Sequence, residues 1–89
     1  MRVTEHSIYI GASQHMTFTE DNSIDLVVTS PPYPMIEMWD DVMSSQNHRI
    51  SDNLEENPEE AFELMHQELD KVWKECFRVL KIGGFLCIN

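Results

Sequence analysis

A long amphipathic segment in the C-terminal half most strongly limits how this chain can fold. Asn57 can cap a helix, Pro58 suits the first helical position, and Glu60 stands at capping-box spacing from Asn57. Apolar residues then recur at steps of three and four, which predicts a helix of about six turns with one buried stripe. The stripe consists of Phe62, Met65, Leu69, Val72, Trp73, Cys76 and Leu80. Gly83 and Gly84 are expected to end the helix.

Short apolar segments on both sides of this helix predict β-strands. Residues 23–28 form a nearly continuous, β-branched run, which is typical of a strand covered on both faces of a parallel sheet. Residues 8–10, followed by Gly11, and residues 85–88 are predicted to form two further short strands. Residues 12–22 are too polar for a long helix and are expected to form a single helical turn at most. This order predicts an α/β fold of mostly parallel strands with one long helix and a right-handed crossover.

The connection that precedes the long helix, residues 35–56, is unusually long and polar. We expect a short helix near residues 37–44, in a segment that either closes over a ligand as a lid or stays in solvent. Ten acidic residues and a single base lie between Glu37 and Glu68. Such a run forms a solvated face or a docking surface for a basic partner, and it is unsuited to a phosphate backbone.

The size and composition of the chain limit its class further. Its 89 residues allow one small domain with a single core. Cys76 and Cys87 form no framework of paired cysteines, and the four histidines lack metal-ligand spacing, so we expect a reduced compartment and no metal site. The sequence has neither an apolar run of membrane-spanning length nor a signal-peptide pattern, so we expect a soluble, cytoplasmic protein without a membrane partner.

A proline-rich loop directly after the second predicted strand is the part of the chain that can carry chemistry. Residues 29–34 read TSPPYP, and three prolines within four positions fix φ at about −65° and stiffen the loop. Because Pro31 and Pro32 lack N–H groups, nearby carbonyl oxygens remain available as acceptors, and Tyr33 adds a flat ring. Ligands bind at the carboxyl ends of strands in open parallel sheets. The alternative is a proline turn that merely ends a strand.

Three segments resemble one enzyme family. DLVVTSPPY at residues 25–33, SIYIG at 7–11 and FRVLKIGGFLCIN at 77–89 are similar to the DNA amino-methyltransferases. These enzymes transfer a methyl group from S-adenosylmethionine to the exocyclic amine of cytosine or adenine in DNA. The resemblance implies a partial Rossmann-like methyltransferase fold. Residues 1–89 would form the N-terminal part of its catalytic domain, in the family's β-type motif order.

The resemblance also implies a role for each residue of the loop. The Ser30 side chain and the Pro31 carbonyl would accept the protons of the target amine, Pro32 would keep their spacing, and Tyr33 would stack on the flipped base. A serine at the head of the motif is more typical of cytosine-N4 enzymes, and adenine N6 stays open. Gly11 would contact the cofactor, at a turn where the family often carries Gly-Asp and this chain has Gly11-Ala12.

The family's FxGxG cofactor loop is absent from the sequence. We therefore expect a catalytic-loop fragment that is inactive alone, either an incomplete gene product or one part of a split enzyme. Its partners would be double-stranded DNA with a flipped target base and a downstream fragment that carries the cofactor loop. The competing interpretation is a small acidic protein-interaction module without catalysis.

Overall fold

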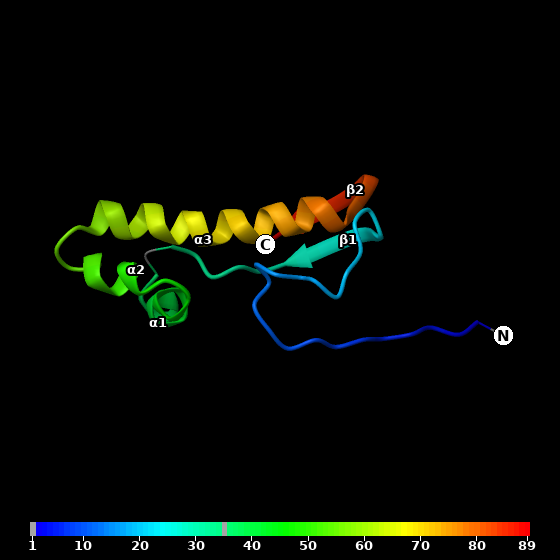
Figure 1. Ribbon diagram of the computed structural model, residues 1–89, viewed down its shortest axis with the longest axis horizontal. Coiled ribbons are helices and arrows are strands. Elements are labelled where there is room, and N and C mark those ends of the chain that lie inside the picture. Colours follow the sequence, from blue (N-terminus) through cyan, green and yellow to red (C-terminus); the bar gives the residue numbers. More distant parts are fainter. Residues whose placement is uncertain (1, 35) are drawn as a thin grey trace.

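One long helix and a two-stranded sheet form the frame of the molecule. The computed structural model describes residues 2–34 and 36–89 and extends over 58 × 23 × 22 Å. In Figure 1, the long helix α3 lies above the short helices α1 and α2 at one end and above β1 at the other, where β2 overlaps the end of the helix in this view. The elements are β1 (Ile24–Thr29), α1 (Glu37–Gln46), α2 (His48–Asn53), α3 (Pro58–Val79) and β2 (Leu80–Ile88).

The two strands pair in parallel, as predicted for an α/β fold. Thr29 pairs with Ile88 and Val28 with Cys87, whereas the register shifts between Ile24 and Leu26. All three helices lie in the connection between the strands. The carboxyl ends of β1 and β2 therefore meet at the same edge of the sheet.

The helix α3 begins where the sequence predicts, and it ends earlier than predicted. The Asn57 side chain accepts a hydrogen bond from the Glu60 N–H at 3.3 Å. The helix ends at Val79, and both predicted stop glycines lie within β2. The chain leaves the helix early because its last carbonyls are already bound: Arg78 O accepts from Asn22 N at 2.9 Å and Val79 O from Ser23 N at 2.8 Å.

The core lies between α3 and the two short helices. Its buried residues are Met43, Ile50, Leu64, Met65 and Leu69, with Leu54 and Trp73 packed against them. The predicted stripe is right for Met65, Leu69 and Cys76, which are buried, and wrong for Phe62, which is 43% exposed. Ala61, Leu64 and Val79 complete the buried face instead, because α1 and α2 pack against the side of α3 that carries Ala61 and Leu64.

The segment predicted as a long connection is mostly helical. The short helix expected near residues 37–44 is confirmed as α1, which continues to Gln46. The second helix, α2, has one apolar residue, Ile50, and that side chain is fully buried. One apolar residue does not make a periodic apolar pattern, so the sequence carries no signal for this helix. Met35, the first residue of the segment, lies outside the described residues.

The predicted strand at residues 8–10 is wrong. These residues lie outside any strand, and the Ile8 and Ile10 side chains are almost fully exposed. The predicted helical turn in residues 12–22 is replaced by two separate turns, closed by His15 N to Ala12 O at 3.2 Å and Thr19 N to Met16 O at 3.0 Å. A strand needs a neighbour for its backbone hydrogen bonds, and the described sheet consists of β1 and β2.

Candidate functional site

The proline-rich loop, of which residues 30–33 are called the proline-rich corner from here on, begins where β1 ends and is accessible to solvent. Ser30 is exposed, Pro31 and Pro32 are half-buried, and the Tyr33 ring is 50% exposed. Only two residues separate Thr29, the last residue of β1, from the second proline of the corner. The corner therefore stands at the carboxyl edge of the sheet, where the sequence placed it.

A pocket of about 230 Å³ joins this corner to the turn that contains Gly11. Its wall comes from both segments and from α1 and α3, and its residues are Gly11, Ala12, Ser13, Gln14, Thr29, Ser30, Pro31, Pro32, Met43, Gln46, Glu68, Leu69 and Val72. The structure thus brings Gly11 together with three of the four predicted catalytic residues. Tyr33 stands outside the described lining of this pocket.

A buried acid on α3 forms the polar wall of the pocket. Glu68 is 4% exposed, and its Oε1 accepts from Lys71 Nζ at 2.8 Å. Gln14 Nε2 donates to Glu68 Oε2 at 3.3 Å and to Gln46 Oε1 at 2.5 Å. Because a buried charge needs such partners, Glu68 draws the Gln14 turn toward α3 and α1. Glu68 was not among the residues predicted for the site; the one signal for it in the sequence is an acid between Met65 and Leu69 on the apolar stripe.

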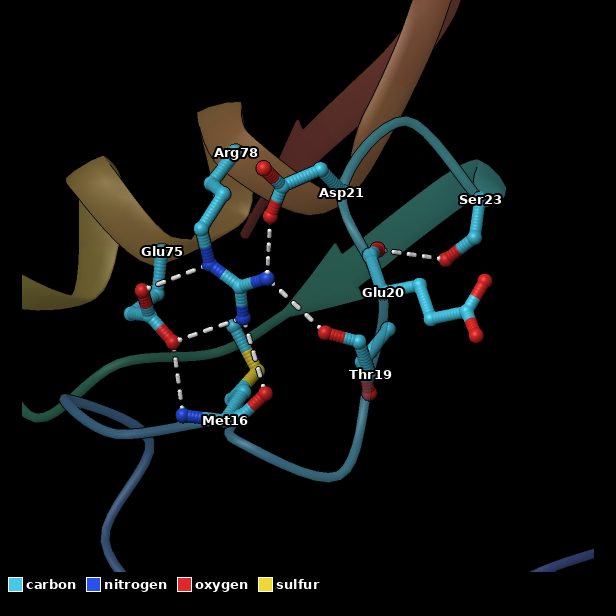
Figure 2. Close-up of polar contacts among 7 residues, drawn as sticks. All are labelled: Met16, Thr19, Glu20, Asp21, Ser23, Glu75 and Arg78. Carbon is cyan, nitrogen blue, oxygen red and sulfur yellow. Dashed lines mark hydrogen bonds and ion pairs between the residues drawn. The ribbon is translucent and has the colours of Figure 1, made fainter.

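Arg78, near the end of α3, binds the residues that follow the Gln14 turn (Figure 2). Its guanidinium donates to Met16 O and Thr19 O, both at 2.8 Å, and pairs with Asp21 Oδ1 at 2.7 Å. It also binds the Glu75 carboxylate at 2.9 and 3.0 Å. Residues 16–21 are thereby held against α3, and the turn just before them is held near the pocket.

The Glu75 carboxylate and the Arg78 guanidinium stabilise each other's charged form. Glu75 Oε2 accepts from Met16 N at 2.7 Å. The hydrogen bond from Arg78, followed by the one from Met16 N, lowers the pKa of the Glu75 carboxyl, and both carboxylates raise the pKa of Arg78. Both groups are therefore held in their charged forms. The sequence showed Arg78 only as a base near a helix end, because three of its four partners, Met16, Thr19 and Asp21, lie about 60 positions away.

The residue after β2 contacts the corner directly. Asn89 N donates to Thr29 O at 2.9 Å, and Asn89 Nδ2 donates to Ser30 Oγ at 3.2 Å. The Tyr33 hydroxyl donates to the main-chain oxygen of Asn89. Asn89 was not singled out from the sequence. The parallel order of the strands was the available signal, since it places the residues that follow Thr29 and Ile88 side by side.

The pocket beside the proline-rich loop is too small to enclose a whole S-adenosylmethionine molecule. Pockets for drug-sized ligands usually have volumes of about 300–1,000 Å³, and this one has about 230 Å³. A Cβ added at Gly11 would meet nothing within 4 Å, so no tight cradle surrounds that glycine. Within residues 2–34 and 36–89, no group of three or more His, Cys, Asp or Glu residues is placed to hold a metal ion, and no helix is long and apolar enough to cross a membrane.

Comparison with known proteins identifies the family. A family model described as DNA methylase, for N6 and N4 methyltransferases, matches residues 24–89. The chain is 49% identical over 88 residues to the type II methyltransferase M.MthZI of Methanothermobacter thermautotrophicus, a match that covers 97% of this chain and 25% of that protein. It is 43% identical over 98 aligned positions to the type II methyltransferase M.MjaI of Methanocaldococcus jannaschii, covering 97% of this chain and 32% of that protein.

The chain thus spans about a quarter to a third of the length of these two relatives. No solved structure matches it. The region matched by the family model contains β1, the proline-rich corner, all three helices and β2. Since that region is most of the sequence, the chain belongs to the DNA methylase family of N6 and N4 amino-methyltransferases.

Proposed function

We propose that this chain is the amine-binding part of a DNA methyltransferase. The enzyme would transfer a methyl group from S-adenosylmethionine to an exocyclic amine of a base, and the proposed target is N4 of cytosine. The observation that carries the proposal is the placement of Ser30 and Pro31 on one pocket at the carboxyl end of β1. Family membership supplies the reaction class. The serine at the head of the corner favours cytosine over adenine.

In this proposal the corner overcomes the low nucleophilicity of the target amine. The lone pair of an exocyclic amine is delocalised into the base, so the nitrogen reacts only when acceptors hold its protons and make it pyramidal. Ser30 Oγ and the Pro31 carbonyl are the two acceptors. Pro31 and Pro32 restrict the backbone around them, so that little reorganisation is needed when the base arrives.

Tyr33 has a separate role in the proposal, because it stands beside the pocket instead of in it. Its ring is half-exposed, and its hydroxyl is held by the main chain of Asn89. A base that leaves the duplex must lose its stacking on its neighbours, and an aromatic ring next to the lining residue Pro32 would replace part of that loss. Tyr33 would therefore stack on the base, as the resemblance implies, while Ser30 and Pro31 hold its amine.

The remaining parts of the enzyme would supply what this pocket is too small to hold. We propose that β1 and β2 are neighbouring strands of a Rossmann-like sheet, and that a downstream segment with the cofactor loop binds most of the methyl donor. Gly11 would meet the donor at the edge of the pocket. Double-stranded DNA would be the partner of the whole enzyme, and the chain alone would be inactive. The three- to fourfold greater length of the two relatives supports this division.

A chimera tests the proposal. This chain would replace the matched quarter of M.MthZI, and transfer of labelled methyl groups to DNA would be followed by identification of the modified base. We expect N4-methylcytosine from the chimera and no transfer from the chain alone. N6-methyladenine would correct the choice of base, whereas a folded chimera that binds DNA but transfers no methyl group would contradict the proposed function.

A further inference from the structure

The residue that follows β2 approaches the corner through three contacts, two made by its main chain and one by its side chain. The main-chain contacts are the hydrogen bonds with Thr29 O and with the Tyr33 hydroxyl. The side-chain contact is the one from Asn89 Nδ2 to Ser30 Oγ, at 3.2 Å. The bond from Asn89 N to Thr29 O continues the pairing of β1 with β2. Because this bond and the one with the Tyr33 hydroxyl both use the main chain of Asn89, they hold the residue in place whatever its side chain is. The side-chain contact has no such structural task.

A free serine hydroxyl rotates about its Cβ–Oγ bond, and its side chain populates up to three staggered rotamers. Ser30 is exposed, so packing does not select one of them. A donor at a fixed position selects the rotamer in which Oγ points toward it and occupies one of the two acceptor sites of that oxygen. The second acceptor site is then left in a defined direction.

We propose that Asn89 is a positioning residue that fixes the Ser30 hydroxyl for the target amine. This inference rests on the proposed function, since it concerns how the same acceptor is oriented. Asn89 touches neither the base nor the methyl donor in this scheme. It acts through Ser30, and its amide is suited to the task because it donates without carrying a charge into the site.

The proposal predicts a particular kinetic pattern. Small displacements of a reacting group lower rates by factors up to about 100, and one lost orienting bond should cost less. In the chimera, Asn89→Ala should therefore lower kcat about tenfold and leave KM for DNA nearly unchanged. A purely structural role for Asn89 would alter stability and KM together.

A double-mutant cycle separates positioning from a general structural effect. Residues that act as a unit give non-additive effects. Once Ser30→Ala has removed the hydroxyl, Asn89→Ala should cause no further loss of kcat. Ser51 provides the matched control: its exposed hydroxyl bonds only to His48 O of its own helix among the described contacts, so Ser51→Ala and Asn89→Ala should add.

Nuclear magnetic resonance of the chain itself tests the contact without any catalysis. The side-chain amide signals of Asn89 should shift in Ser30→Ala and stay in place in Ser51→Ala. Unchanged amide signals in Ser30→Ala would overturn the inference, as would a tenfold loss from Asn89→Ala that persists in the Ser30→Ala background. Full transfer by Ser30→Ala, in contrast, would contradict the proposed function.

Discussion

The guanidinium of Arg78 donates to the main-chain oxygen of Met16 at 2.8 Å, which joins the end of α3 to a turn 62 positions earlier in the chain. The same guanidinium binds Thr19 O and two carboxylates, so one side chain holds four groups (Figure 2). An arginine can do this because its planar fork presents five donors. The cluster holds against α3 the residues that follow the N-terminal wall of the pocket.

Loss of the Arg78 fork should release residues 16–21 from α3. We expect Arg78→Ala to lower the urea midpoint of unfolding and to speed proteolysis within those residues. Arg78→Lys should rescue only part of the effect, because an ammonium keeps the charge and loses the fork geometry. Lys74→Ala is the matched control, since Lys74 is an exposed base one turn earlier on α3. Equal midpoints for Arg78→Ala and Lys74→Ala would contradict this role.

The Glu75 carboxyl should make the stability of the chain sensitive to acid. Its pKa in the folded chain lies below the ordinary value of 4.5, chiefly because Arg78 donates to it. A lowered pKa contributes stability above the unfolded-state value, and that contribution is lost as the pH falls through the folded-state value. The difference in unfolding free energy between the wild type and Glu75→Gln should therefore be constant above about pH 5 and shrink below pH 4.5. A difference that stays constant down to pH 3 would contradict the assignment.

The two cysteines should react at very different rates. Cys76 is 3% exposed, and burial together with the nearby Glu75 charge raises the pKa of its thiol. Cys87 is exposed on β2. Because the thiolate is the reactive form, iodoacetamide at pH 8 should label Cys87 first and Cys76 only when the chain unfolds. Mass spectrometry of the digested protein measures both rates. Equal rates under native conditions would show that the C-terminal end of α3 is not packed as described.

A side chain in place of Gly84 in β2 should crowd the main chain around it. A Cβ added at Gly84 would lie 3.0 Å from Lys81 O and 3.1 Å from Asp25 O, both main-chain atoms that cannot move aside alone. Gly84→Ala should force β1 and β2 apart and cost about 1–3 kcal/mol of stability. Gly11→Ala is its control, because a Cβ there meets nothing within 4 Å. Similar urea midpoints for the two variants would contradict the described pairing of the strands.

The sequence was informative where one local signal determined the structure. Asn57 and Pro58 define the start of α3, and the β-branched run before Thr29 defines β1. The corner follows from the prolines, whose restricted backbone needs no tertiary partner. These features depend on neighbours in the chain, so they could be predicted from the residues alone.

The features that could not be predicted depend on distant partners. The helix α2 is fixed by the burial of Ile50 against the core, and α3 ends early because Asn22 and Ser23 bind its last carbonyls. The prediction of a strand at residues 8–10 was wrong because β propensity does not form a strand without a neighbouring strand to pair with. Asn89 lies beside the corner because Ile88, the residue before it, pairs with Thr29 in the sheet. Each case required knowledge of which segments lie side by side.

The role of the proline-rich corner is tested most sharply by the single-turnover rate of methyl transfer by the chimera with and without the Ser30 hydroxyl. Removal of one preorganised polar partner of the reacting group typically lowers kcat by about 10²–10³-fold. We expect a loss of that size for Ser30→Ala and an unchanged rate for Ser51→Ala, with both variants folded and able to bind DNA. A rate for Ser30→Ala within a factor of two of the unmodified chimera would show that this corner does not hold the target amine.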